Sequence, residues 1–139
     1  RAMMATEIED LDLCHPWPCS PNEAIEKAQA LEKLSMDQDS RLTNSKGSSV
    51  DSYQAYRVYA NSHGFCEGYA STRHSLSCSL LAEQDGQMES DYAYTMARAA
   101  DDLESVDLLA KQVAERTVSR LGARKIKTCK VPVLFDSRI

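Results

Sequence analysis

The chain has 139 residues, of which 42% are hydrophobic and 27% charged, with a formal net charge of −5. These values are typical of a globular protein and exclude a fibrous or disordered chain. The acidic balance, with no dense basic patch, disfavours nucleic-acid binding through phosphates. No apolar run approaches the roughly 20 residues that a transmembrane helix needs, and no signal peptide is visible.

The ends of the chain and its cysteines give two further expectations. The sequence begins with Arg1 and stops at Ile139, shortly after an apolar run, so we expect a piece of a longer protein. Five cysteines without a secretory signal predict free thiols in a reducing cytoplasm. They are Cys14, Cys19, Cys66, Cys78 and Cys129.

Two segments carry helix signals. Residues 1–19 lack periodicity and read as a linker, after which Ser20, Pro21 and Glu23 predict a capped helix over 20–36. A second helix is predicted over 105–121, with Ser105 as its cap. The expected buried residues of the first helix are Ala24, Ile25, Ala28, Leu31 and Leu34, and those of the second are Val106, Leu109, Ala110, Val113, Thr117 and Leu121.

The middle of the chain alternates with a period of two. Residues 40–49 read as a turn, and antiparallel strands are predicted over 50–98, with a turn at 61–64. Asp85 and Gly86 form the dipeptide that a two-residue type I′ hairpin turn prefers. A last strand is predicted over 130–135, placed at an edge by Pro132. The expected class is α+β, an antiparallel meander packed with two helices.

The stretch "GYASTRHSLSCSLLAEQDGQ" places hydroxyl, imidazole and thiol groups close together in sequence. On a strand, however, His74 points to the face opposite the serines beside it, and Cys78 lies roughly 13 Å along the strand from His74. A nucleophile and its base need contact within about 3 Å. The stretch therefore predicts a structural strand with no local Ser–His or Cys–His dyad.

The hairpin turn also predicts cross-strand neighbours. Pairing Gln84 with Gln87 places Ser79, Ser77 and Ser75 opposite Tyr92, Tyr94 and Met96, which leaves room for the large side chains and lets the hydroxyls bond the phenols. Arg73 then faces Arg98, and like charges in that position need an anion between them. The anion is Asp51, Asp101 or Asp102, or else a carboxylate of a ligand or partner. We therefore expect Arg73 and Arg98 to be candidate peptide- or partner-binding residues.

Other kinds of site find little support. Cys14, His15 and Cys19 would need His63 and Cys66 as further zinc ligands, and these spacings match the known zinc patterns poorly. The five glycines are scattered singly, so no phosphate-binding loop is present. Asp101 and Asp102 read as capping acids before a helix. No catalytic or metal-binding residue is predicted in this chain.

The run "NSHGFCEGYASTRHSLSCSLLAEQDGQMESDYAYTMARA" resembles the middle region of the TldD/PmbA family of bacterial modulators and metalloproteases. "DLDLCHP", "SPNEAIEKA", "RLTNSKGSS" and "RTVSRLGARKIKTCKVPVLF" fit the same region in order, while "STRHSLS" and "DYAYT" resemble its PmbA-type (TldE-type) branch. The resemblance implies a heterodimer with a TldD-type subunit, which holds zinc through a His-Glu-x-x-x-His motif and a distant cysteine in its C-terminal domain. By the same resemblance, we expect residues 1–139 to be a middle region from which the C-terminal domain is absent. PmbA-type subunits lack that motif, and Cys129 is not the matching cysteine.

Two functions follow from the resemblance. The first is a noncatalytic, cytoplasmic partner subunit of a zinc metalloprotease that processes unfolded and leader-type peptides, including microcin precursors and an antitoxin. In that reading the region is structural or binds a peptide or partner, and an extended peptide could add to its sheet. The alternative is a regulatory module that acts on DNA gyrase, as the family's older name suggests.

Overall fold

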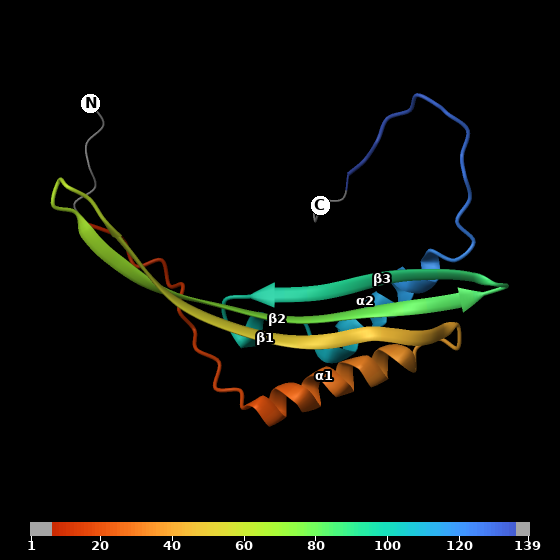
Figure 1. The fold of residues 1–139 in the computed structure, drawn as a ribbon, viewed down its shortest axis with the longest axis horizontal. Helices are drawn as coiled ribbons and strands as arrows, with labels where there is room; N and C mark the ends of the chain where they lie inside the picture. Colours follow the sequence, from red (N-terminus) through yellow and green to blue (C-terminus); the bar gives the residue numbers. More distant parts are fainter. Residues whose placement is uncertain (1–6, 136–139) are drawn as a thin grey trace.

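The computed structural model of the protein describes residues 7–135, which form a three-stranded antiparallel sheet and two helices (Figure 1). The strand order in the sheet is β1-β2-β3, so β1 and β3 are its two edges. The predicted α+β meander is confirmed. In chain order the elements are α1 (Pro21–Met36), β1 (Leu42–Ala60), β2 (Cys66–Gln84), β3 (Gln87–Ala97), the short 3-10 helix η1 (Ala100–Asp102) and α2 (Val106–Ser119).

The β2–β3 hairpin has the predicted turn and register. Asp85 and Gly86 both have positive φ, 52° and 75°, as a type I′ turn requires. Gln84 pairs with Gln87, and the ladder continues until His74 pairs with Ala97. The three predicted serine pairs are all present, namely Ser79 with Tyr92, Ser77 with Tyr94 and Ser75 with Met96.

Strand β1 begins earlier than predicted. Residues 42–49 pair with β2 and are not a turn, and two register shifts, between Leu42 and Asn44 and between Ser45 and Gly47, interrupt the ladder. Gly47 has a φ of 117° beside the second shift. Such bulges let turn-forming residues lie within a strand, which explains why the local composition indicated a loop.

Both helices have the predicted caps. The Ser20 hydroxyl accepts a hydrogen bond from the Glu23 N–H, and the Glu23 carboxylate accepts one from the Ser20 N–H at 2.8 Å, which completes a capping box. The Ser105 hydroxyl caps α2 by accepting from the Leu108 N–H at 3.3 Å, without a capping box. Ile25, expected on the buried side of α1, is 55% exposed instead.

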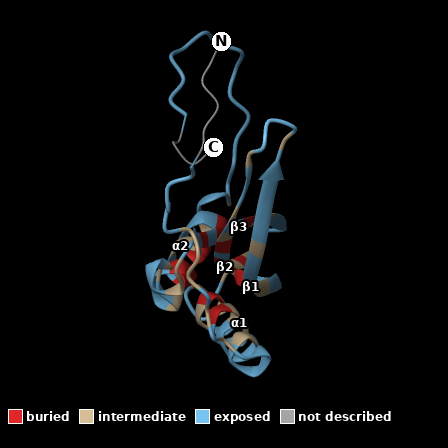
Figure 2. Cartoon of the chain, turned by 90° about the vertical axis from the view of Figure 1, so that its left-hand side faces the viewer, coloured by how far each residue is buried: buried red, intermediate tan, exposed pale blue. Residues whose placement is uncertain are grey.

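The core lies between the helices and one face of the sheet (Figure 2). Alternation along β2 is as predicted, with the side that carries His74 buried and Arg73 exposed. Within residues 7–135 no helix lies on the other face of the sheet, and we call this the open face. The buried hydrophobic residues are Leu31, Leu42, Leu76, Cys78, Leu80, Ala82, Ala93, Leu109, Ala110, Val113 and Ala114.

Beyond the end of β3, strands β1 and β2 continue as a two-stranded arm, residues 53–73, that extends past the helices (Figure 1). Several aromatic side chains on it are exposed, among them Tyr56 and Tyr59. Gly68 lies under Tyr56, since a Cβ there would come within 2.9 Å of the Arg57 carbonyl oxygen and of the Tyr56 ring. A two-stranded ribbon is marginally stable alone. The N-terminal segment, residues 7–19, lies beside the arm, and the Thr72 N–H donates to its Leu13 carbonyl.

The predicted strand over 130–135 does not form, which corrects that expectation. Residues 123–135 contain no helix or strand and are exposed, with Leu134 at 98%. A strand needs a neighbouring strand for its backbone hydrogen bonds, and among the described residues no strand pairs with this segment. In the described part of the chain, no helix combines the length and apolar character needed to cross a membrane.

Candidate functional site

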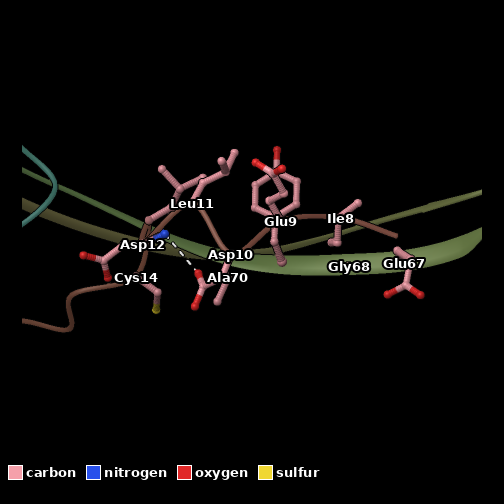
Figure 3. A pocket seen from close by; sticks show the side chains of 11 residues that line it. Ile8, Glu9, Asp10, Leu11, Asp12, Cys14, Glu67, Gly68 and Ala70 are labelled. Atoms are coloured by element: carbon pink, nitrogen blue, oxygen red, sulfur yellow. Dashed lines mark hydrogen bonds between the residues drawn. The ribbon is translucent and has the colours of Figure 1, made fainter. Parts of the chain in front are cut away.

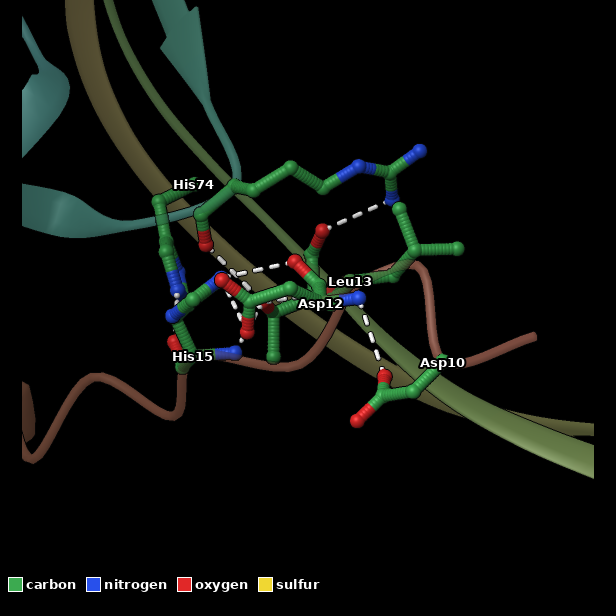
Figure 4. A network of polar contacts seen from close by, with 7 residues as sticks. Asp10, Asp12, Leu13, His15 and His74 are labelled. Carbon is green, nitrogen blue, oxygen red and sulfur yellow. Dashed lines mark hydrogen bonds and ion pairs between the residues drawn. The ribbon is translucent and has the colours of Figure 1, made fainter.

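His74 is buried in the interior and links the hairpin to the N-terminal segment (Figure 4). Its Nε2 lies 2.9 Å from the carbonyl oxygen of His15, and its Nδ1 lies 3.0 Å from the Ser52 hydroxyl. Because a carbonyl can only accept, Nε2 carries the proton in the neutral ring and Nδ1 accepts from Ser52. The Trp17 ring packs against the imidazole in a T-shaped arrangement, with the two ring centres 5.4 Å apart. The imidazole thus acts as a cross-link between two segments.

Thr72 and Arg98 extend this network where β3 ends. The Thr72 N–H donates to the Leu13 carbonyl at 2.8 Å, and the Thr72 hydroxyl donates to the Arg98 carbonyl at 2.8 Å. In return, the Arg98 guanidinium donates through Nη1 to the Thr72 carbonyl at 2.9 Å. Arg98 therefore supplies a hydrogen bond to the Thr72 carbonyl, which lies beyond His74–Ala97, the last pair of the β2–β3 ladder.

The two arginines do not face each other as a pair, which corrects the predicted arrangement. The ladder ends at His74 and Ala97, one position before they would meet. Arg73 lies on the open face, with its guanidinium carbon 5.7 Å from the centre of the Tyr53 ring. Within residues 7–135 neither arginine forms an ion pair with Asp51, Asp101 or Asp102. Asp101 and Asp102 lie exposed in η1 and do not cap a helix of their own.

The open face carries hydroxyl and aromatic side chains in rows. Ser77 bonds the Ser49 hydroxyl of β1 at 2.9 Å, and Ser79 donates to the Asp91 carbonyl at 3.3 Å. Ser77 and Ser79 thus form hydrogen bonds with groups other than the expected phenols. Tyr92 and Tyr94 stack on each other at 6.3 Å, and both are about half exposed. The face is a polar, aromatic surface without a covering element in the described residues.

A groove of about 950 Å³ runs between β3 and α2. At one end of it the nearly buried Asp91 accepts a 2.7 Å hydrogen bond from Arg120 and lies 3.7 Å from Arg116. Burial alone would raise the pKa of Asp91, but the hydrogen bonds from Arg120 and the Tyr92 N–H, together with the two positive charges, hold that pKa below its usual range. The guanidinium of Arg116 also lies over the Tyr92 ring, 5.8 Å from its centre.

A second pocket, of about 720 Å³, lies between the N-terminal segment and the arm (Figure 3). Its lining includes the carboxylates of Glu9, Asp10, Asp12 and Glu67, and one of them, Asp10, accepts from the Asp12 N–H at 3.0 Å. Throughout residues 7–135 there is no group of three or more His, Cys, Asp or Glu side chains arranged to hold a metal ion.

Comparison with known proteins places this fold in a family. The sequence profile described as the PmbA/TldA metallopeptidase central domain matches residues 14–121. The chain belongs to the PmbA/TldD metallopeptidase family. The family's central domain therefore comprises α1, the meander and α2, and the loop at residues 123–135 follows it.

Individual members of the PmbA/TldD family agree with this assignment. The chain is 45% identical over its whole length to Metalloprotease PmbA of Escherichia coli O157:H7, of which it covers 31%. It spans about a third of the length of the curated relatives that it matches.

Two solved structures share the fold. A Bacteroides thetaiotaomicron protein described as a candidate modulator of DNA gyrase superposes with a TM-score of 0.77 at 22% identity, over 88% of this chain and 29% of that one. TldE from Thermococcus kodakarensis gives a TM-score of 0.55 at 17% identity, over 73% of this chain and 22% of that one.

The cluster of Asp91, Arg116 and Arg120 was missed by sequence reasoning. A signal for it exists, because the predicted register places Asp91 on the buried face of β3, where a lone carboxylate needs a partner. Arg116 in α2 and Arg120 at its C-cap lie one helical turn apart at the end of the helix that covers that face. Only the packing of α2 against β3 brings the three together.

Proposed function

We propose that this chain is the central domain of a PmbA-type (TldE-type) subunit that works with a TldD-type, zinc-carrying subunit to cleave unfolded and leader-type peptides. The observation that carries the proposal is the 45% identity to Metalloprotease PmbA across the whole chain. The fold likeness to TldE is consistent with it. In this proposal the zinc is held by the TldD-type subunit, and residues 7–135 of this chain do not bind it.

The role of this domain in the proposal is to shape the surface that a peptide or partner meets. Its open face and the groove beside β3 together offer exposed tyrosines, serines and paired charges. Arg73, exposed on the open face, remains a proposed partner-binding residue, and so does Arg98, although its contact with Thr72 also gives it a structural role. The free state of all five cysteines supports a cytoplasmic location.

The test is a peptidase assay of the full-length protein with and without a TldD-type partner, with zinc measured in each preparation. Activity that requires both proteins, with zinc in the TldD-type protein, is the expected result. Peptidase activity of the full-length protein alone would overturn the partner-subunit role. Arg73→Ala and Arg98→Ala should weaken partner or peptide binding, and unchanged binding in both would remove these residues from the proposed contact.

A second candidate function is regulation of DNA gyrase. It is favoured by the fold match to the Bacteroides thetaiotaomicron protein described as a candidate gyrase modulator. The net charge of −5 indicates contact with protein and not directly with DNA. A change in gyrase supercoiling rate on adding the purified full-length protein is the measurement, and an unchanged rate at a tenfold excess would reject this candidate.

A further inference from the structure

Ser52 and His74 form a serine–imidazole pair across the β1–β2 ladder. They are partners in the strand register, and the Ser52 hydroxyl donates to the His74 Nδ1 at 3.0 Å. This is the contact that a serine nucleophile and its general base need. Neighbours on one strand point to opposite faces, so only a partner on the next strand can supply the contact.

The imidazole of His74 is held in the tautomer that a general base requires. Its Nε2–H donates to the His15 carbonyl at 2.9 Å (Figure 4), which leaves Nδ1 unprotonated and directed at Ser52. His74 is 1% exposed, and Trp17 packs against its ring. In a Ser-His-Asp triad a carboxylate fixes the tautomer and stabilises the imidazolium that forms. The backbone carbonyl of His15 occupies the corresponding position here.

The hydroxyl of Ser52 is accessible from outside the protein. Ser52 is exposed and belongs to β1, which is an edge strand of the sheet. It lines neither of the two pockets described above. The pair therefore combines a buried base with a nucleophile at an open surface.

The backbone N–H of Ser52 points away from the sheet. Alternate residues of an antiparallel ladder direct both N–H and C=O to the same side. The Thr72 carbonyl lies on the β3 side of β2, where Arg98 donates to it, so Arg73 faces β1 and its partner Tyr53. One position before Tyr53, the Ser52 N–H points outward, and within residues 7–135 no hydrogen bond outside the ladder uses it. It is free to donate to an oxyanion formed beside the Ser52 Oγ, as the N–H of a nucleophilic serine does.

We propose that Ser52 and His74 form an esterase site that takes small acyl esters with good leaving groups. The Ser52 Oγ attacks the carbonyl carbon while His74 Nδ1 takes the hydroxyl proton. The ester C–O bond then breaks, and the leaving oxygen receives that proton from Nδ1. Water releases the acyl group by the same steps in reverse order, giving its proton to Nδ1 and returning the hydroxyl to Ser52. The net reaction is ester plus water to acid plus alcohol.

The preference for good leaving groups follows from the open surface. One outward N–H stabilises the oxyanion, and neither described pocket encloses the reacting carbonyl. Such a site contributes little binding energy to the transition state, so the ester must be activated in itself. Aryl esters and thioesters meet that requirement.

The test labels the full-length protein with a biotinylated fluorophosphonate, without a TldD-type subunit and with a zinc chelator present. In this reaction the Ser52 oxygen bonds to phosphorus, the P–F bond breaks, and the proton passes through His74 Nδ1 to fluoride. Mass spectrometry of the tryptic peptides should find about one phosphonyl group per chain, on Ser52. An unmodified Ser52 peptide after prolonged exposure would overturn the proposal.

Two variants test the roles of the pair. Ser52→Ala should lose the label, together with the rapid release of about one equivalent of p-nitrophenol from p-nitrophenyl acetate. His74→Gln has no base, so labelling of Ser52 should slow about 100-fold or more. Circular dichroism checks that each variant is folded. An unchanged labelling rate in folded His74→Gln would refute the role of the imidazole.

Ser62 provides a matched control in the same protein. It is exposed and adjacent to His63 in sequence, but among the described residues no hydrogen bond joins their side chains. Ser62→Ala should therefore leave the labelling unchanged. Labelling of Ser62 as fast as that of Ser52 in the wild type would show that His74 does not activate Ser52. This comparison needs no variant of His74.

The outcome is separable from that of the proposed function. Labelling of Ser52 without any partner-dependent peptidase activity would refute only the proposed function. Partner-dependent peptidase activity with an unreactive Ser52 would refute only the esterase site.

Discussion

The imidazole Nε2 of His74 and the carbonyl oxygen of His15 lie 2.9 Å apart, although 59 residues separate them along the chain. This hydrogen bond attaches the segment before α1 to the middle of β2. With Ser52 on the other ring nitrogen, it links three parts of the chain through one side chain.

Replacing His74 should loosen this link. His74→Ala leaves the Ser52 hydroxyl and the His15 carbonyl without their partner and creates a cavity beside Trp17, so the free energy of unfolding should fall by about 2–4 kcal/mol. Urea denaturation measures the change. Hydrogen exchange should show residues 13–17 losing protection first. The exposed His63→Ala serves as the control, with a change within about 0.5 kcal/mol. A His74 variant as stable as the control would contradict the cross-link.

Asp91→Asn should weaken the contact between β3 and α2, with a pH dependence of known sign. The pKa of Asp91 is lowered in the folded protein, so its ionised form contributes stability above the ordinary Asp pKa of about 4, and that stability is lost as the pH falls through the lowered folded value. We expect Asp91→Asn to cost about 1–3 kcal/mol at pH 7.

Thermal unfolding of the wild type and Asp91→Asn from pH 7 to pH 3 measures this difference. The two curves should begin to converge as the pH falls below the ordinary Asp pKa of about 4, and they should meet only as the pH passes the lowered folded pKa, where the wild-type carboxylate becomes protonated. The exposed Asp102→Asn is the matched control and should follow the wild type. A constant difference across the whole range would show that the charge of Asp91 is not the cause.

Gly68→Ala should destabilise the arm. A Cβ at this position would lie 2.9 Å from the Arg57 carbonyl oxygen, a backbone atom that cannot rotate away. We expect a loss of about 1–3 kcal/mol, together with faster hydrogen exchange along the arm. The neighbouring Glu67→Ala, which is exposed, is the control. If Gly68→Ala in a Tyr56→Ala background recovered full stability, the ring and not the backbone would be the obstacle.

Arg98 and Arg73 should differ in their effect on stability. Arg98→Gln removes the guanidinium that donates to the Thr72 carbonyl, and a charged hydrogen bond of this kind contributes about 1.5–3 kcal/mol. Arg73→Gln removes only an exposed contact with Tyr53, worth about 0.5–1 kcal/mol. Parallel urea titrations decide the order, and a larger loss for Arg73→Gln would reverse the roles assigned here.

The sequence by itself determined the local and periodic features. The Asp85-Gly86 turn fixed the β2–β3 register down to the serine pairs, because a two-residue loop leaves only one alignment. Ser20 and Ser105 located the helix starts, since capping depends on residues three positions apart. Family resemblance was also readable from the motifs and agrees with the match over residues 14–121.

Tertiary structure alone decided which distant groups meet. The first part of β1 contains bulges and turn-forming residues, so its composition predicted a turn where the structure has a strand. The strand predicted at 130–135 does not form, because no strand in the described residues pairs with it. Arg73 and Arg98 do not form a strand pair because β3 ends one position before them. The bond of His74 to His15 and the ion pairs of Asp91 with α2 join segments far apart in sequence, and such contacts depend on how helices pack on the sheet, which no local pattern records.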